Sequence, residues 1–300
     1  MQLFPKKLSQ IYLVLFVSAF LTITGNFTFF QKTILIYPLS ENWLFLGSLF
    51  FFLFTFLAAL LLLFCYRVTT KPILMVLLMI SAIVSYSTNN YGIVFDHNMI
   101  LNTFETDTSE FLDLVSFKSI LYFFIFGLLP SIFVLKVKLK KISFKAQLWE
   151  RIKTFLVLVI IFVIIVLTFS KHYSSFAREN RDLRLYITPT YYLYSATKFV
   201  DSKFATSTKP FKEIGLDAKL NKKSDTRRLV ILVVGETARA DHMSLNGYDR
   251  NTNPYLEKEE IISFDKMTSC GTDTALSVPC MFSLLDRSSY NHAKGKNMSN

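Results

Sequence analysis

Long apolar stretches alternate with short polar loops over the first 170 residues of the chain. A bilayer core of about 30 Å needs about 20 mostly apolar residues for each crossing helix. Five stretches approach that length: Ile11–Phe30, Trp43–Tyr66, Pro72–Asn90, Ser119–Leu135 and Thr154–Ser170. The second and the fifth contain no charged residue, and a single central charge would cost about 3 kcal/mol. The pattern predicts five transmembrane helices.

Composition and the placement of charge support a membrane protein and predict its orientation. The chain is 52% hydrophobic and only 18% charged, which is too apolar for a soluble or disordered protein. Its formal net charge is +11; the loop 136–153 is strongly basic, whereas the loop 96–113 is acidic. Because short cytoplasmic loops are rich in Lys and Arg, we expect a cytoplasmic N-terminus, with residues after Ser170 outside the cytoplasm. Much of the basic excess is therefore a topology signal, and no nucleic-acid partner is expected.

Residues 171–228 are polar and basic, with tyrosines interleaved among arginines and lysines. Aromatic rings and basic side chains together suit the headgroup layer of a membrane. We predict an interfacial helix and linker that contact membrane lipids. An ordinary solvated linker is the alternative.

A continuous apolar run, Leu229–Val234, follows this linker and leads into a Gly-Glu-Thr turn that contains Glu236. Such a β-branched run is typical of a strand buried on both faces of a parallel α/β sheet. Because ligands bind at the carboxyl ends of strands in these sheets, Glu236 is a candidate metal ligand. A cap or solvated turn residue is the simpler interpretation.

The segment 268–280 places hydroxyl groups between two cysteines. Cys270 and Cys280 lie outside the predicted membrane helices, and a disulfide between them suits the oxidising side of a bacterial membrane. Each hydroxyl needs an adjacent base or a metal to become a nucleophile, and a purely structural loop is the alternative. The candidate nucleophiles are Thr272, Thr274 and Ser277.

The acidic segment 97–115 has helical periodicity, and Asn102, Thr106 and Glu110 recur in it every four residues. That spacing places an amide, a hydroxyl and a carboxylate on one helix face. The three groups suit the amine of a cationic headgroup. The alternative is the wet face of an interfacial helix.

These segments, in this order, resemble the phosphoethanolamine transferases of Gram-negative inner membranes, the family that decorates lipid A and includes the colistin-resistance enzymes. The matching text is VVGETARAD at 233–241, SLNGY at 244–248, TNP at 252–254 and SCGTDTALSVPCMFS at 269–283. The five-helix first half and the acidic helix extend the resemblance along nearly the whole chain.

The resemblance implies a fold and a location. Residues 1–170 would form the α-helical transmembrane domain and residues 171–228 the interfacial helix and linker. Residues 229–300 would form the amino-terminal part of a periplasmic α/β domain of the alkaline-phosphatase and sulfatase type. The protein would then be a multi-pass protein of the bacterial inner membrane.

The resemblance also implies a ping-pong mechanism with Thr274 as the nucleophile. Zn²⁺, with Glu236 and Thr274 among its ligands, would activate the hydroxyl for attack on phosphatidylethanolamine. Diacylglycerol would leave, and the phosphoethanolamine group would pass to lipid A or the lipopolysaccharide core. The other assignments implied are the substrate-binding residues Asn102, Thr106 and Glu110 and the disulfide pair Cys270 and Cys280.

Members of this family continue beyond the point where this sequence stops, and their remaining metal ligands, an Asp-His pair and further histidines, lie there. The four histidines of this chain stand in no pattern that matches those ligands. We therefore interpret the sequence as the amino-terminal portion of a transferase and expect it to be inactive alone. The alternatives are a phosphoglycerol-transferase type of membrane enzyme and a non-catalytic membrane remnant.

The charge asymmetry of the loops predicts which of them a membrane-impermeant thiol reagent reaches. Single cysteines at Ser143, in the basic loop, and Ser109, in the acidic loop, are compared in spheroplasts. Only the cysteine at position 109 is expected to react, because the basic loop stays in the cytoplasm. Equal labelling, or labelling at 143 alone, contradicts the orientation.

Overall fold

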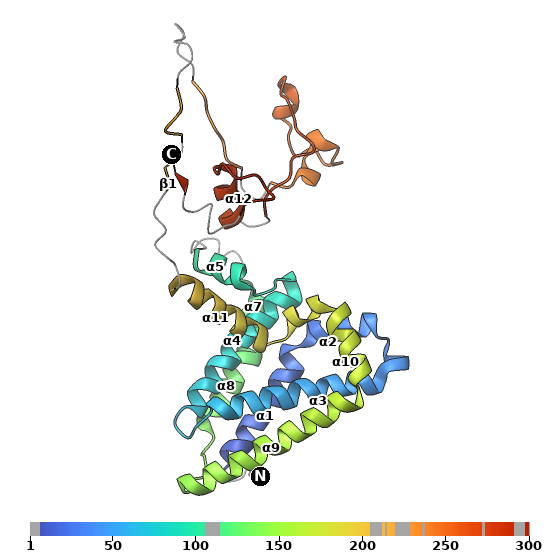
Figure 1. The fold of residues 1–300 in the computed structure, drawn as a ribbon, viewed down its shortest axis with the longest axis vertical. Coiled ribbons are helices and arrows are strands. Elements are labelled where there is room, and N and C mark those ends of the chain that lie inside the picture. Colours follow the sequence, from blue (N-terminus) through green and yellow to red (C-terminus); the bar gives the residue numbers. More distant parts are fainter. Residues whose placement is uncertain are drawn as a thin grey trace. The chain divides into compact units, whose positions relative to one another are not determined.

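The computed structural model describes residues 7–105, 115–204, 212–213, 215–219, 229–235, 238–271, 274–290 and 298–299. Its contacts divide the chain into two units, Met1–Ala205 and Thr206–Asn300. The first unit is a helical bundle (Figure 1). The division into residues 1–170, 171–228 and 229–300 stays a prediction.

Short connections join the helices of the first unit (Figure 1). Those before residue 106 are α1 (Gln10–Gly25), α2 (Phe27–Ile36), α3 (Leu39–Phe64), α4 (Thr70–Tyr91) and α5 (His97–Glu105). Those after residue 114 are α7 (Phe117–Phe123), the π-helix η1 (Phe124–Leu128), α8 (Leu129–Lys136), α9 (Phe144–Thr168), α10 (Ser170–Glu179), the 3-10 helix η2 (Arg181–Tyr186) and α11 (Thr190–Phe204). Helix α3 packs against both α1 and α9, and α4 packs against α1, α7 and α8.

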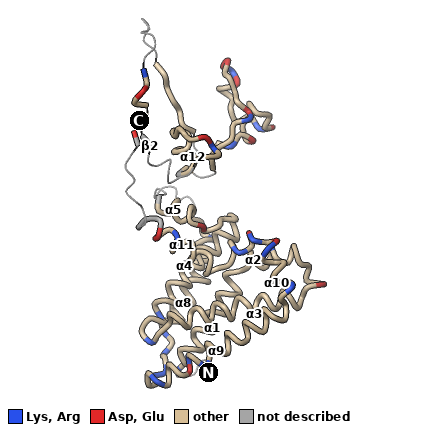
Figure 2. Tube along the Cα trace, viewed as in Figure 1, with Lys and Arg blue, Asp and Glu red and all other residues tan. Residues whose placement is uncertain are grey.

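Among the described residues, four helical stretches are long and apolar enough to cross a bilayer, namely α3, α4, the α7–η1–α8 stretch and α9. Helices α1 and α2 form a pair bent by 58°, which makes a fifth span if the pair crosses as one. In Figure 2 the long runs of α3 and α9 are tan, whereas blue Lys and Arg gather near the beginning of α9. The predicted multi-pass helical membrane fold is confirmed, with four to five spans.

The fifth predicted span begins too late, because α9 starts at Phe144 rather than at Thr154. The Ser143 hydroxyl caps the helix by accepting a hydrogen bond from the Ala146 N–H at 3.4 Å. Residues 144–153 fall in the stretch expected to be loop, but their five charged and polar residues are Lys, Gln, Glu and Arg, which are good helix formers. Hydropathy locates the bilayer-crossing part of a helix, and capping locates its first residue.

A buried arginine joins α9 to the end of α3. The guanidinium of Arg151 donates hydrogen bonds to the carbonyl oxygens of Leu62 and Cys65, and it lies 4.2 Å from the ring centre of Tyr66. The Gln10 side chain of α1 donates to the same Cys65 carbonyl at 2.6 Å. Carbonyls at a helix C-terminus lack intrahelical partners and carry partial negative charge, so a cation there is stabilised.

The first predicted span, Ile11–Phe30, extends over α1 and α2, because Asn26 interrupts the helix with φ −117° and ψ 24°. The Asn26 side chain is 1% exposed, and its amide donates to the Thr188 carbonyl oxygen at 2.9 Å. In return its Oδ1 atom accepts the Thr188 N–H at 2.9 Å. A Cβ at Gly25 would lie 3.3 Å from Thr188 Cγ2, so the close approach favours glycine there. The same amide donates to the Leu21 and Thr22 carbonyl oxygens of α1, at 3.1 and 3.3 Å. One asparagine thus pairs backbone carbonyls at the end of α1 and binds the chain that leads into α11.

Helix α11 contributes to the core of the bundle and does not lie only on its surface. Tyr192 is 6% exposed and belongs to the same buried cluster as Leu13, Leu61 and Leu78. Its hydroxyl lies 3.1 Å from the Ser81 hydroxyl of α4. Polar contacts between helices are favourable in lipid, where an unpaired hydroxyl has no water to bind.

The described residues of the second unit form short elements only. They are β1 (Lys212–Glu213), η3 (Ala240–His242), η4 (Ser244–Asn246), η5 (Leu256–Lys258), α12 (Thr274–Met281) and β2 (Met298–Ser299). Strands β1 and β2 pair in parallel. The strand predicted at 229–236 is wrong for the described residues 229–235, which form no strand and whose leucine and valine side chains are 43–86% exposed. A parallel strand needs neighbouring strands as hydrogen-bond partners, and in the described part of the chain none pairs with this run.

The Asn26 contact predicts a large loss of stability on substitution by leucine. Asn26→Leu leaves the N–H and C=O groups of Thr188 buried without these partners, at about 1–3 kcal/mol for each group. We expect the free energy of unfolding to fall by about 2–6 kcal/mol, seen as a lower melting temperature of the detergent-solubilised protein. The control is Asn98→Leu, at an exposed position of α5. Equal melting temperatures for both variants contradict this role of Asn26.

Candidate active site

The predicted nucleophile Thr274 is the first residue of α12, and its side chain is exposed. The first N–H groups of a helix have no intrahelical acceptor, and the helix dipole adds partial positive charge at that end. A phosphate group or a developing alkoxide is stabilised there. The position therefore suits an oxygen that attacks a phosphodiester.

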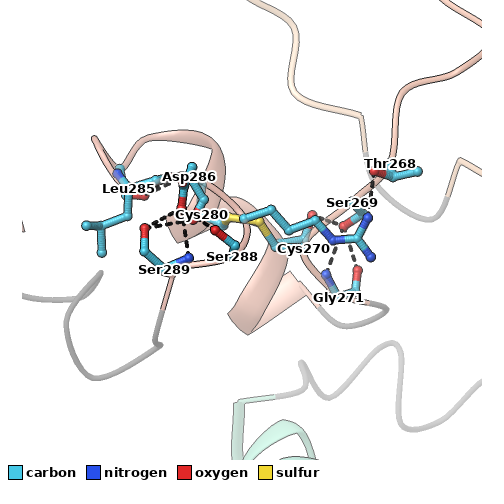
Figure 3. The surroundings of a disulfide bond; sticks show 12 residues. Thr268, Ser269, Cys270, Gly271, Cys280, Leu285, Asp286, Ser288 and Ser289 are labelled. Carbon is cyan, nitrogen blue, oxygen red and sulfur yellow. Dashed lines mark hydrogen bonds between the residues drawn. A yellow bond between two sulfur atoms is a disulfide. The ribbon is translucent and has the colours of Figure 1, made fainter.

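A disulfide connects the segment before α12 to the last turn of that helix (Figure 3). Cys270 and Cys280 are bonded, with 6.4 Å between their Cα atoms, and Cys280 is buried. The predicted pairing is present in the structure. The closed loop includes Thr274, so the bridge restricts where its backbone can lie.

Ser269 organises the same loop, and sequence reasoning missed it. Its Oγ donates to the Gly271 carbonyl oxygen at 2.6 Å and accepts the Gly271 N–H at 3.2 Å. The Ser269 and Ser277 hydroxyls lie 2.8 Å apart, and Ser277 is the donor because the single Ser269 proton is already used. Ser277, one of the three candidate nucleophiles, therefore holds the loop against α12. The Arg287 guanidinium adds a bond to the Thr268 hydroxyl at 2.8 Å (Figure 3).

The three shorter sequence blocks fold onto one another. The Thr252 hydroxyl donates to the His242 carbonyl oxygen at 2.7 Å and accepts the Ser244 N–H at 3.0 Å. The Asn246 amide donates to the Ala240 carbonyl oxygen at 3.0 Å. Gly247, at φ +92°, occupies a left-handed conformation that favours glycine. These contacts explain why the blocks 233–241, 244–248 and 252–254 occur together.

An exposed charged group lies within the first of these blocks. The Arg239 guanidinium bonds the Asp241 carboxylate at 2.6 and 2.9 Å, and His242 Nδ1 lies 3.0 Å from the same carboxylate. The hydrogen bonds from Arg239 and then from His242 hold the pKa of Asp241 well below its usual range. The carboxylate therefore stays ionised at neutral pH and fixes the Arg239 side chain. Sequence reasoning gave these residues no role.

In the first unit, Asn102 is half-buried on α5. Helix α5 packs on α11, where the rings of Phe104 and Phe199 stack with centroids 5.2 Å apart. The other two members of the predicted substrate face, Thr106 and Glu110, lie outside the described residues, as does the predicted ligand Glu236. Thr272 also lies outside them.

Among the described residues, no three His, Cys, Asp or Glu side chains lie close enough together to hold a metal ion. Of the two predicted ligands, the structure describes Thr274 only. Its hydroxyl and the Glu236 carboxylate are oxygen donors, a ligand type that zinc accepts, and together they would fill part of a four-coordinate site.

Two family models match consecutive parts of the chain. The model described as phosphoethanolamine transferase EptA/EptB matches residues 53–204, and the sulfatase model matches residues 228–300. The fold and the matches define a multi-pass membrane protein with a segment that matches the sulfatase family. The match to the sulfatase family suggests that the protein depends on a metal ion.

Individual relatives support the same assignment. The chain is 39% identical over 293 residues to phosphatidylethanolamine transferase Mcr-1 of Escherichia coli, covering 96% of this chain and 54% of that protein. It is 31% identical over 290 residues to phosphoethanolamine transferase EptA of Salmonella typhimurium, covering 94% and 53%. The structure of lipooligosaccharide phosphoethanolamine transferase A from Neisseria meningitidis superposes with a TM-score of 0.89 at 29% identity, covering 98% of this chain and 56% of that one.

The chain belongs to the EptA/EptB family of phosphoethanolamine transferases. It spans about half the length of the curated relatives it matches.

The disulfide predicts a protease-sensitive loop when both cysteines are replaced. In the variant with Cys270→Ala and Cys280→Ala, the closed loop is released, at a cost of about 3 kcal/mol or less. We expect faster proteolytic cleavage in residues 268–290, measured by mass spectrometry of the fragments. Cys65→Ala is the control, since Cys65 is a buried free thiol of the first unit. An unchanged cleavage rate in the double variant contradicts a constraining role.

Proposed function

We propose that the protein transfers phosphoethanolamine from phosphatidylethanolamine to lipid A or the lipopolysaccharide core. The observation that carries the proposal is the position of Thr274, at the N-terminus of α12 inside a disulfide-closed loop. The names of the relatives support the transferred group and the lipid donor. Two further relatives, 47% identical over 53 residues, act by name on Kdo(2)-lipid A, which supports a lipid A type of acceptor.

The proposed reaction has two displacements at phosphorus. The Thr274 oxygen attacks the phosphodiester, an O–P bond to the threonine forms, and the bond from phosphorus to the glycerol oxygen breaks. Diacylglycerol leaves with a proton, and the group stays on Thr274 as a phosphodiester. An acceptor phosphate or hydroxyl oxygen then attacks phosphorus and regenerates the threonine hydroxyl. The partial positive charge at the start of α12 favours the negative charge that builds up on the phosphoryl oxygens.

Zinc is the metal we propose for this site. Glu236 and Thr274 are the residues of this chain that would hold it, and both offer oxygen donors. Bound zinc would favour loss of the hydroxyl proton and so supply an activated nucleophile. The disulfide and the Ser269–Ser277 bond then serve to keep Thr274 in position.

For the donor headgroup we propose Asn102, Thr106 and Glu110. A carboxylate, a hydroxyl and an amide spaced by four residues can together bind an ammonium group, with Glu110 supplying the opposite charge. Stacking of Phe104 on Phe199 fixes α5 against α11 and so sets the position of Asn102.

The proposed location is the bacterial inner membrane, with the N-terminus in the cytoplasm and residues after Ser170 in the periplasm. Two independent features support it. Basic residues cluster in the loop that joins α8 to α9, as cytoplasmic loops require. The Cys270–Cys280 disulfide suits an oxidising compartment, where such bonds persist.

The nucleophile assignment predicts complete loss of transfer when Thr274 is replaced by alanine. The variant is tested in the full-length gene product, with fluorescent phosphatidylethanolamine as donor and lipid A as acceptor. Thr274→Ala removes both the attacking oxygen and the site of the intermediate, whereas Thr272→Ala should be milder because neither is lost. Transfer at the wild-type rate in Thr274→Ala places the nucleophile elsewhere.

A further inference from the structure

The 3-10 helix η2 sorts its residues onto three separate ridges. A 3-10 helix has 3.0 residues per turn, so side chains three positions apart lie above one another. In η2 this places Arg181 above Arg184 and Leu183 above Tyr186, with Asp182 on the remaining ridge. Opposite charges that are neighbours in sequence are therefore directed to different sides of the segment.

The apolar ridge of η2 anchors it in the first unit. Leu183 is 6% exposed and lies in a buried cluster with Phe29, Phe45 and Leu49, and Tyr186 packs against that cluster. The Lys32 ammonium also lies over the Tyr186 ring, 5.0 Å from the ring centroid. The orientation of η2 is thus fixed by packing, and the direction of its basic ridge follows from it.

The basic ridge borders an apolar groove of about 350 Å³. Arg181 and Arg184 line the groove together with Asn180, whereas Asp182 does not. Its apolar lining comes from α2, α3 and α10: Phe29, Leu49, Phe52, Leu53, Tyr173, Phe176 and Ala177. Leu49 and Leu53 lie within the span of α3, so the groove reaches from charged side chains into the apolar depth of the membrane unit.

The two guanidinium groups are exposed, and among the described residues neither forms an ion pair. The nearby carboxylate of Glu179 instead interacts with residues of its own helix, α10. It accepts a hydrogen bond from the Ser175 hydroxyl at 2.8 Å and lies 3.9 Å from the Arg178 guanidinium. Two stacked positive charges beside an apolar groove match an anion that is attached to a hydrocarbon chain. Guanidinium groups bind phosphate oxygens in pairs, which makes phosphate the matching anion.

We propose that this groove binds a lipid whose headgroup carries a phosphate monoester. An acyl chain lies along the half-buried side chains of Phe52, Tyr173 and Phe176, and the phosphate lies between Arg181 and Arg184. A monoester carries close to two negative charges at neutral pH, which balances two guanidinium groups. A phosphodiester lipid such as phosphatidylglycerol carries one negative charge, and phosphatidylethanolamine has no net charge. A phosphorylated lipid is also the acceptor class of the proposed transfer to lipid A, and only that link rests on the proposed function.

Native mass spectrometry of the purified chain in detergent tests the proposal, with phosphatidic acid, phosphatidylglycerol and phosphatidylethanolamine offered at equal concentration. We expect phosphatidic acid to bind at least about tenfold more tightly than the other two, because the second negative charge adds a charge-assisted bond. Inorganic phosphate at the same concentration is expected not to displace it, since the acyl chain supplies part of the affinity.

Three variants distinguish lipid binding in the groove from nonspecific attraction to surface charge. The double variant Arg181→Gln with Arg184→Gln should remove the preference for phosphatidic acid. Ala177→Phe should weaken the binding of all three lipids, because the larger side chain fills the groove while both arginines remain. Arg178→Gln, which removes one exposed charge outside the groove, should change binding less than twofold. Far-UV circular dichroism confirms that each variant is folded.

Equal affinity for phosphatidic acid and phosphatidylglycerol overturns the proposal. So does a preference that survives the double arginine variant, or one that Arg178→Gln reduces as strongly. Binding is read without any transfer reaction, so these outcomes leave the proposed function untouched. Loss of transfer in Thr274→Ala, conversely, leaves the groove untouched.

Discussion

Backbone hydrogen bonding in apolar surroundings is the constraint on which the described structure depends. Within a bilayer an unpaired N–H or C=O group has no water to bind, so each break in a helix needs a substitute partner. Asn26 supplies one where α1 ends, because its amide donates to the carbonyls of Leu21 and Thr22 and also pairs with the backbone of Thr188. Arg151 supplies another where α3 ends, through the carbonyls of Leu62 and Cys65. Both contacts join segments far apart in sequence, so they also set how the helices pack.

Contacts of this kind also position the candidate functional residues. The bonds of Asn26 to Thr188 fix the start of α11, and α11 then holds α5 with Asn102 through the Phe104–Phe199 stack. Packing of η2 directs two arginines along one groove. In the second unit, a disulfide and a serine pair do the same for the loop that carries Thr274. In each unit, side-chain contacts therefore position a candidate site residue that remains accessible.

Local patterns predicted the features that depend on local chemistry. Runs of apolar residues located the spans, and two cysteines outside the predicted membrane helices predicted the disulfide. Both predictions follow from residue type alone, because apolar residues favour lipid and paired cysteines oxidise outside the cytoplasm. The bend at Asn26 and the missing strand at 229–235 depend on partners elsewhere in the chain. The early start of α9 is set locally by the Ser143 cap, which a hydropathy pattern does not register. Ser269 carried no signal either, since a lone serine is common on any surface, and Arg181 was predicted only as one of several basic residues near the headgroup layer. Their roles come from contacts with Ser277 and with the groove.

The central claim is that Thr274 carries the phosphoethanolamine group between donor and acceptor. The most direct measurement is peptide mass spectrometry of the full-length gene product after incubation with phosphatidylethanolamine, without acceptor and quenched in acid. The account predicts one phosphoethanolamine adduct, located by fragmentation on Thr274, together with an equal amount of diacylglycerol. An adduct on Thr272 or Ser277, or release of diacylglycerol with no adduct on the protein, would contradict it.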